Sequence, residues 1–527
     1  MKKMVALVLA MAVCLACLFA CTPSPTSTTQ KTTKPNKDDT TAPGGEASNR
    51  WEEADFENET LVFSVSVNQS KDVTYPAADR YIKGPDALDS TTDEVIRMVY
   101  NRNHNVVQKL NINLQYQTND FVVGTTVAEI DKIMQGAAED APDIWNGDVY
   151  DLIKVMLNGH LWNIKNPGLD PATGRQVESW FDFSADCWYN DFMEGTTFDK
   201  DKIYMVVGDF FIDVVRMAWV LYVNADRFND TYNESWGSLF QLYNLVQEGE
   251  WDYDTLRFFC ESAFRDTTGD GVADDKDEQI GMVLNSVAER LFTWTNGLSI
   301  VDFSESVPKI NRDSRALSHF SSAFTTLYNT SGIYHIKAST GTASGIRMAT
   351  QCFMNNTSLF CTAQLGELES EELRQAPFRK GLVPLPKFSL TEQEEYYTLV
   401  HDQAEVGVIL NNTSVFPAVS AYLQYINEQS TAVLEEYYEN SLKFKYTDDK
   451  ETRVMIDLVH DRVSSPVDSL LVRLICSIYS DAKKEIYSYV LDDAQNQSAS
   501  FASNYDACVD AWQIGLQKML TIQEGIE

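Results

Sequence analysis

Residues 93–116 read DEVIRMVYNRNHNVVQKLNINLQY, and this stretch indicates the fold class. Apolar residues recur at helical spacing from Val95 to Leu110, and Asn111 to Tyr116 then alternates as a strand. Upstream, Thr60 to Val67 (TLVFSVSV) has the length and the β-branched composition of a buried strand. A strand, a helix and a strand in that order predict a parallel βαβ unit, so the fold class is α/β.

The alternation continues along the chain. Val127 to Met134 predicts a helix, and Pro142 to Trp145 opens a short strand. Further buried strands are predicted at Ile203 to Val207, Val214 to Val223, Ile280 to Leu284, Gly381 to Pro384 and Val406 to Leu410. Amphipathic helices are predicted at Ala418 to Tyr425, Thr431 to Tyr446, Thr452 to Val463, Ser469 to Leu491 and Tyr505 to Gln523.

The composition is that of a globular and strongly acidic protein. The 527 residues include 42 Lys plus Arg against 77 Asp plus Glu, a formal charge of -35, and 44% are hydrophobic. A surface this negative repels phosphate groups and anionic lipid head groups, which argues against nucleic-acid binding and electrostatic membrane docking. At about 150 residues per domain the length fits two to three units, and we expect two large lobes.

The first fifty residues predict export and lipid anchoring. Lys2 and Lys3 precede an apolar run from Met4 to Ala20, which is typical of a signal peptide over 1–20. Leu18-Phe19-Ala20-Cys21 resembles the lipobox of bacterial lipoproteins, so Cys21 is the predicted lipidation site. The alternative is a secretory signal cut elsewhere. The acylated Cys and a polar, disordered tether then occupy 21–50, and the body is expected at the extracytoplasmic face of the cell membrane.

One short segment resembles an EF-hand calcium loop, with Gly271 at the sharp turn. A predicted helix over Tyr253 to Phe264 enters it, and a strand follows it, so we expect a structural Ca²⁺ site and no sensor pair. The alternative is an acidic, solvated turn without metal. The predicted ligands are Asp266, Thr268, Asp270, the Val272 carbonyl, Asp274 and Asp277.

Motifs of catalysis are not found in the sequence. It has six His without an HExxH pair, and it lacks a GxSxG elbow, a GxxxxGK loop and a GxGxxG loop after a strand. The SxxK match at Ser306 to Lys309 contains Pro308, which disfavours the required helix. We therefore expect a protein that is not an enzyme.

Six cysteines beyond the signal region leave the disulfide state open, because they allow 15 pairings and free thiols remain the alternative. They are Cys187, Cys260, Cys352, Cys361, Cys476 and Cys508.

Several segments, taken in order, resemble the extracellular solute-binding proteins of bacterial ABC importers, of the sugar-binding family 1 type. The segments are Val99-Tyr100-Asn101-Arg102-Asn103, Lys202 to Asp209, Leu221 to Asp226, Leu242 to Asp254, the Asp266 to Gly271 loop, Gly381 to Lys387, Tyr437 to Glu439 and Met455 to Leu458. This sequence departs from the family where its asparagine-lysine pair becomes Asn224-Ala225.

The resemblance implies a two-lobed periplasmic-binding-protein-like fold, with a hinge and a ligand cleft between the lobes. Lobe 1 is expected over 51–208 plus about 355–405, and lobe 2 over 209–354 plus about 406–527. The chain is expected to cross between lobes near Val206 to Phe211, Ala349 to Ser358 and Glu405 to Ile409.

Sugar sites combine aromatic faces with amides and carboxylates that pair with hydroxyl groups. For each predicted Trp the alternative is a packing role, and for Asp209 it is a hydrogen-bonding role at the hinge. The predicted ligand-binding residues are Asn68, Gln69, Trp145, Asn146, Asp148, Trp188, Tyr189, Asp209 and Trp294.

The function predicted from these features is that of a lipid-anchored substrate-binding protein. It would capture a small solute, an oligosaccharide, as a monomer and deliver it to an ABC permease. Two alternatives remain, a cell-surface glycan hydrolase and a structural or adhesion lipoprotein without a ligand.

Overall fold

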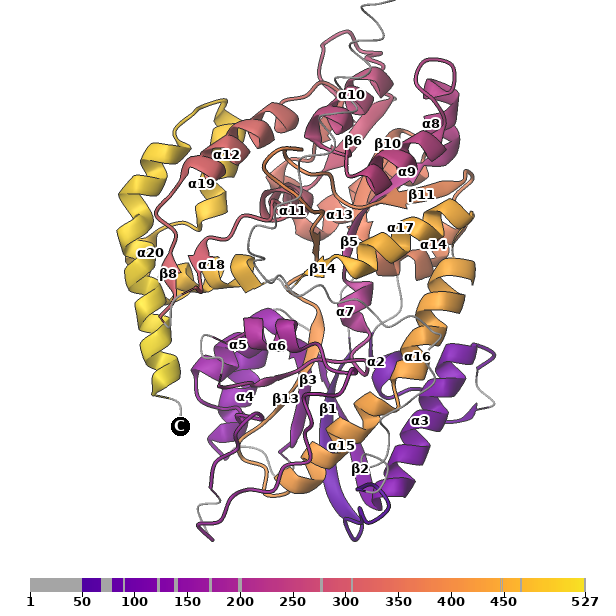
Figure 1. Cartoon of the computed structure of the whole chain (residues 1–527). Coiled ribbons are helices and arrows are strands. Elements are labelled where there is room, and N and C mark those ends of the chain that lie inside the picture. Colours follow the sequence, from indigo (N-terminus) through magenta and orange to yellow (C-terminus); the bar gives the residue numbers. More distant parts are fainter. Residues whose placement is uncertain are drawn as a thin grey trace, which may run out of the picture. The chain divides into compact units, whose positions relative to one another are not determined.

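A computed structural model describes residues 50–67, 78–88, 91–120, 124–136, 141–169, 173–197, 201–274, 278–304, 307–445, 447, 449–464 and 467–525. The chain divides into two compact units, Met1–Glu53 and Ala54–Glu527. The predicted signal peptide, Cys21 and the predicted tether up to residue 49 lie outside the described residues. The second unit carries the fold discussed below (Figure 1).

The first of two five-stranded sheets contains the predicted βαβ unit. Its strand order is β2-β1-β3-β13-β4. β1 runs parallel to β2 and β3, whereas β13 pairs antiparallel with β3 and β4. The strands are β1 Glu59–Val67, β2 Ile112–Asp120, β3 Ile144–Asp148, β4 Met205–Val206 and β13 Glu405–Ile409.

Helix α3, Glu94–Leu110, joins β1 to β2 as the sequence predicts. It begins where the Asp93 carboxylate accepts a hydrogen bond from the Ile96 N–H, and it ends at Asn111 in the left-handed conformation (φ 49°). Val99 and Val106 are fully buried on its inner face. Local capping and periodicity therefore define this unit.

The second sheet has the order β11-β5-β10-β6-β9. β5 pairs antiparallel with β10 and β11, and β6 pairs parallel with β10 and β9. The strands are β5 Trp219–Asn224, β6 Ile280–Leu284, β9 Ile333–His335, β10 Ser358–Gln364 and β11 Lys380–Val383. The fold class of mixed α/β with two sheets is confirmed.

Helices pack on both sheets and form a further group near the C-terminus (Figure 1). Around the first sheet are α2 Asp79–Ile82, α4 Thr126–Met134, α5 Val149–Leu157, α6 Asn190–Gly195 and α15 Phe416–Glu428. Around the second are α8 Ala225–Tyr232, α9 Leu239–Glu248, α10 Tyr253–Ala263, α11 Ser286–Trp294, α13 Thr342–Met354, α14 Glu371–Arg374 and α17 Lys450–Asp461. The further group contains α12 Arg315–Tyr328, α18 Val467–Ile478, α19 Ile486–Asn496 and α20 Phe501–Glu524.

Short elements complete the fold. Two small sheets pair β12 Thr398–Leu399 with β14 Val463–Ser464, and β7 Val301–Asp302 with β8 Lys309–Ile310. The 3₁₀ helices are η2 Ala338–Thr340, η3 Leu365–Glu369 and η5 Ser480–Ala482. Among the described helices, none is both long and apolar enough to cross a bilayer.

In the part of the chain that the structure describes, three connections run between the two sheets. The first contains α7, Asp213–Arg216, between β4 and β5. The second runs from β11 to β13, and the third passes from α15 through α16, Thr431–Glu435, and the π-helical η4, Glu436–Lys445, into α17.

The expected crossing at Ala349 to Ser358 is wrong, because that segment is α13 and the start of β10, both beside the second sheet. The expected crossing at Glu405 to Ile409 is strand β13 itself, so the second connection precedes it.

The sheets also divide the chain differently from the predicted lobe segments. Residues 355–405, expected in lobe 1, contain β10 and β11 of the second sheet, whereas β13, mostly within the expected lobe 2 segment, belongs to the first sheet. Pairing partners that lie far along the chain decide which sheet a strand joins, and a strand's own pattern does not encode them.

Candidate functional site

Asp148 lies at the carboxyl edge of the first sheet, where β3 ends and α5 begins. Its Oδ1 accepts a hydrogen bond from the Asp151 N–H at 2.9 Å and so caps α5. Asp148 is 1% exposed, and its Oδ2 has no hydrogen-bond partner among the described residues. Burial, followed by the nearby Asp151 carboxylate, raises the pKa of Asp148 to about 7. Ligands of α/β sheets characteristically bind at this edge.

The second connection lies against the start of α5. The Val149 N–H donates to the Ala404 carbonyl at 3.2 Å, and the Tyr150 N–H donates to the Asp402 carbonyl at 3.2 Å. The first N–H groups of a helix have no partner within the helix, and here the connection supplies acceptors for two of them. These two bonds bring Asp402 beside Tyr150.

Arg473, on α18, joins three elements at this point. Its guanidinium forms an ion pair with the Asp402 carboxylate. The guanidinium carbon lies 4.1 Å from the centroid of the Tyr150 ring and 5.9 Å from that of Trp294, the last residue of α11. We call Asp148, Tyr150, Trp294, Asp402 and Arg473 the aromatic–arginine cluster.

His401 supports the cluster from the second connection. Its Nδ1 accepts a hydrogen bond from the Gln403 N–H at 3.0 Å, and its ring stacks on Trp219 with centroids 5.4 Å apart. Burial, followed by the charge of Arg473, lowers the pKa of His401 to about 4. The imidazole is therefore neutral at pH 7, and Arg473 is the cation that pairs with Asp402.

The cluster offers the groups that a hydroxylated ring compound needs. Tyr150 and Trp294 have flat apolar faces, and the Nε1 of Trp294 is a buried donor without a partner in the described part of the chain. The Oδ2 of Asp148 accepts hydrogen bonds when ionised and donates one when protonated. Chemically, the arrangement can bind a polar ring without a covalent step.

Of the predicted ligand residues, Asp148 and Trp294 belong to the cluster, and Trp145 lies on the same strand as Asp148. Trp145 is 4% exposed, and its Nε1 is without a hydrogen-bond partner within the described ranges. Asn146 differs, because its Oδ1 accepts from the Ser66 N–H and its Nδ2 donates to the Val406 carbonyl. Its side chain joins β1, β3 and β13.

Trp188, Tyr189 and Asp209 form a second group beside the first connection. The Nε1 of Trp188 donates to Gln424 of α15 at 3.1 Å. The Oδ2 of Asp209 accepts from the Thr431 hydroxyl at 2.6 Å. Burial, then the charge of Asp209, raises the pKa of Tyr189 well above its ordinary value. These contacts favour packing for Trp188 and the hydrogen-bonding alternative for Asp209.

Asn68 and Gln69 lie outside the described residues. Sequence reasoning missed Tyr150, Asp402 and Arg473. Arg473 had a signal, because it interrupts the apolar run Leu470 to Ile475 in a helix. A single cation within such a run needs a buried partner.

The acidic loop brings three carboxylates together. Oxygens of Asp266, Asp270 and Glu278 all lie within 4.8 Å of one another. Asp266 also accepts hydrogen bonds from the N–H groups of Gly269 and Gly271, at 2.5 and 2.7 Å. The predicted ligand Asp277 lies outside the described residues, and Glu278, one position later, was missed.

Other predicted ligands lie near Glu278. The Thr268 hydroxyl donates to its Oε1 at 3.1 Å, and the Asp274 N–H donates to its Oε2 at 3.0 Å. Val272 is exposed. The expected entering helix and following strand are present as α10 and β6. Within the described part of the chain, the six cysteines that left the disulfide state open form no disulfide; they are Cys187, Cys260, Cys352, Cys361, Cys476 and Cys508.

Comparisons with known proteins give structural matches only. No family model matches the chain, and no curated protein matches it. The GacH receptor of Streptomyces glaucescens is 13% identical, with a TM-score of 0.44 over 89% of this chain and 100% of that chain.

Two structures from Listeria monocytogenes also match over 89% of this chain. An ABC substrate-binding protein in complex with cycloalternan is 14% identical, with a TM-score of 0.48 over 99% of its own length. The maltose-binding periplasmic protein MalE in complex with maltose is 13% identical, with a TM-score of 0.49 over 97% of its own length.

Proposed function

We propose that this chain is a substrate-binding protein that captures an oligosaccharide and delivers it to an ABC permease. The observation that carries the proposal is the aromatic–arginine cluster. It gathers two aromatic faces, a buried carboxyl oxygen and a buried indole N–H at the carboxyl edge of a sheet. The ordered sequence segments that resemble ABC solute-binding proteins support the same function.

The chemistry of the cluster suits a sugar. A pyranose ring presents an apolar face that would stack on Trp294, while its hydroxyl groups would pair with Asp148 and the indole N–H. Tyr150 would hold Arg473 in place beside the ligand, because the guanidinium and Lys154 Nζ both lie over its ring. A buried hydroxyl left without a partner costs about 1–3 kcal/mol, so these polar groups would select a polyhydroxylated ligand over an apolar one.

Anchoring and calcium binding belong to the same proposal. Lipidation at Cys21 would hold the protein at the extracytoplasmic face, near its permease. The Asp266, Asp270 and Glu278 carboxylates would hold a structural Ca²⁺, because clustered carboxylate oxygens are the ligands that this ion prefers.

A glycan hydrolase is the second candidate, because a carboxyl group with a pKa of about 7 can act as a general acid. Asp148 has that property. Release of reducing ends from maltotetraose or cellotetraose, lost in Asp148→Asn, would favour hydrolysis over binding.

The binding proposal is tested by titration calorimetry with the same two tetrasaccharides, followed by a glycan library in a thermal-shift screen. We expect Tyr150→Ala to weaken binding at least tenfold. The matched control is Tyr100→Ala, which removes a tyrosine that stacks on His104 of α3. If no saccharide binds, or if both variants weaken binding equally, the proposed site is wrong.

A further inference from the structure

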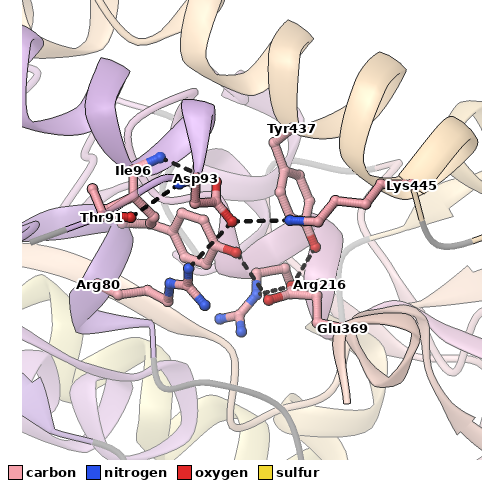
Figure 2. A network of polar contacts seen from close by, with 9 residues as sticks. Arg80, Thr91, Asp93, Ile96, Arg216, Glu369, Tyr437 and Lys445 are labelled. Carbon is pink, nitrogen blue, oxygen red and sulfur yellow. Dashed lines mark hydrogen bonds and ion pairs between the residues drawn. The ribbon is translucent and has the colours of Figure 1, made fainter. Parts of the chain in front are cut away.

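A buried ionic network joins the connections between the two sheets (Figure 2). Arg216, the last residue of α7, is fully buried. Its Nε donates to Glu369 Oε1 at 2.8 Å, and its NH1 donates to Asp213 Oδ1 at 3.0 Å. The Oδ2 of Asp213 accepts from the Glu405 N–H at 3.1 Å. The first connection is thereby bonded to the end of the second.

Glu369 receives two further donors. It ends η3, which follows β10 of the second sheet. The hydroxyl of Tyr437, in η4 of the third connection, donates to its Oε1 at 2.6 Å. The hydroxyl of Tyr81 donates to its Oε2 at 2.9 Å. One carboxylate therefore holds groups from the first connection, the third connection and α2 (Figure 2).

Tyr81 and Glu369 both lie outside the three connections. Glu369 belongs to the second-sheet side, and Tyr81 to the first. Tyr81 is part of α2, which packs on β1 and α3 beside the first sheet. Its bond to Glu369 thus joins a helix packed on the first sheet directly to the 3₁₀ helix that follows β10 of the second. A bond inside a connection can persist when two bodies turn about that connection, whereas a bond between the bodies must break.

The surroundings of Tyr81 keep its hydroxyl a donor. The Arg216 guanidinium carbon lies 4.8 Å from its ring centroid, and the Tyr437 ring packs edge-on with centroids 5.5 Å apart. Burial, followed by the Glu369 charge, raises the pKa of Tyr81 well above its ordinary value. The hydroxyl stays protonated at every physiological pH.

The Arg102-Asn103 pair, part of the segment that resembles solute-binding proteins, holds α2 in place. Arg102 NH2 donates to the Tyr81 carbonyl at 2.7 Å. Asn103 Nδ2 donates to the carbonyls of Ile82 and Lys83, at 2.8 and 2.9 Å. The last carbonyls of a helix have no partner within the helix, so these donors fix the end of α2 and with it the position of Tyr81.

Two weaker ion pairs lie beside the network (Figure 2). Asp93, at the start of α3, pairs with Lys445 of η4 at 3.1 Å and with Arg80 of α2 at 3.6 Å. The Lys445 side chain is 48% exposed, so water and salt screen its ion pair with Asp93. The buried Tyr81–Glu369 bond is stronger than these ion pairs.

We infer that Tyr81 is a positioning residue that sets the affinity of the ligand site without contacting the ligand. Its bond to Glu369 stabilises the arrangement of the two sheets described above, and ligand release requires that bond to break. This inference rests on the proposed function, because it assumes that ligand is held between moving lobes.

The test is Tyr81→Phe, which removes the hydroxyl and keeps the ring. Because the lost bond involves a charged acceptor, we expect the Kd for a bound tetrasaccharide to rise about tenfold. The dissociation rate carries the change, and the association rate stays within about twofold. Small-angle scattering of the ligand-free variant should give a larger radius of gyration than the wild type.

The matched control is Tyr253→Phe. Tyr253 is also buried, and its hydroxyl donates to the Phe292 carbonyl at 3.0 Å beside the second sheet alone. We expect a similar loss of stability but an unchanged radius and dissociation rate. If Tyr81→Phe behaves like this control, Tyr81 is only structural and the inference is overturned.

Two further outcomes are informative. If Tyr81→Phe does not fold, Asn103→Ala, which frees the end of α2, should raise the dissociation rate in the same direction, and an unchanged rate overturns the inference. If the wild type binds neither maltotetraose nor cellotetraose nor any glycan of the library, the proposed function fails. In that case, the radii of gyration of ligand-free Tyr81→Phe and Tyr253→Phe still test whether Tyr81 stabilises the arrangement of the two sheets.

Discussion

The guanidinium of Arg473 lies 4.1 Å from the centre of the Tyr150 ring, so a helix late in the chain contacts the first turn of a helix that begins at residue 149. Tyr150 precedes Arg473 by more than half of the chain. The same guanidinium pairs with Asp402 in the second connection. One cation thereby determines how three distant segments meet at the candidate site.

Arg473→Gln should destabilise the protein and weaken saccharide binding. Asp402 is 7% exposed, and losing its cation leaves a buried carboxylate unpaired, at a cost of about 1–3 kcal/mol. Urea unfolding gives the free energy of unfolding. The control is Arg312→Gln, whose pair with Asp510 is exposed and should contribute less than about 0.5 kcal/mol. Equal losses in the two variants would contradict a special role for Arg473.

Asp148 should make stability fall as pH rises from about 4 to about 7. The pKa of its carboxyl is raised by burial from 3.8 to about 7, so between these values the folded state binds a proton that the unfolded state has released. Asp148→Asn keeps a capping side chain and removes this titration. We expect the variant to gain stability relative to wild type at pH 8 and not at pH 4.

Urea midpoints at both pH values measure the difference between Asp148→Asn and wild type. Asp86→Asn serves as the control, because the Asp86 side chain is 91% exposed. An unchanged difference between pH 4 and pH 8 would show that Asp148 does not titrate in this range.

Calcium should stabilise the acidic loop. The three carboxylates repel one another without a cation, and a dissociation constant of about 0.1 mM would raise Tm by a few degrees at about 1 mM Ca²⁺. Glu278→Gln should abolish the rise, because Glu278 is the buried member of the group. Differential scanning calorimetry with Ca²⁺ or EDTA checks this, with Glu261→Gln as the control. Identical melting in both solutions would refute the calcium site.

Cys21→Ala should abolish lipid labelling, because the thioether of a lipoprotein forms only on that thiol. Metabolic labelling with a fatty-acid analogue measures the modification, and Cys187→Ala is the control. Persistent labelling of Cys21→Ala would contradict the anchor.

The local sequence pattern predicted individual helices and strands better than it predicted which of them pair or pack together. The pattern from Asp93 to Tyr116 contains its own capping residue and periodicity, and it predicted both α3 and β2, although β2 continues four residues beyond the predicted end, to Asp120. The strand Ser358–Gln364 was not predicted, because its short apolar run follows a helix directly and its partners lie at Val223 and Met282. The predicted helix from Ser469 to Leu491 is two helices, since the chain turns at Lys483, which has a positive φ of 54°.

The site was predicted only in part for the same reason. Asp148 stood out as a polar residue that follows a predicted strand, and Trp294 was predicted only because it is aromatic. Arg216 lies in the segment predicted as a strand from Val214 to Val223, whereas the structure has helix α7 there, and Arg216 forms a buried ion pair with Asp213. Tyr81 and Glu369 carry no local signal, because 288 positions separate them and only the folded chain brings them together.

The place of β13 in the first sheet also governs when this protein can fold. Asn146 and Val406, bonded across that sheet, lie 260 positions apart, so β3 has no neighbour on that side until most of the chain is available. Contacts this distant slow folding, because a large loop must close before they form. A chain that folds slowly stays unfolded for longer after synthesis, and an unfolded chain is the form that a narrow translocation channel can pass.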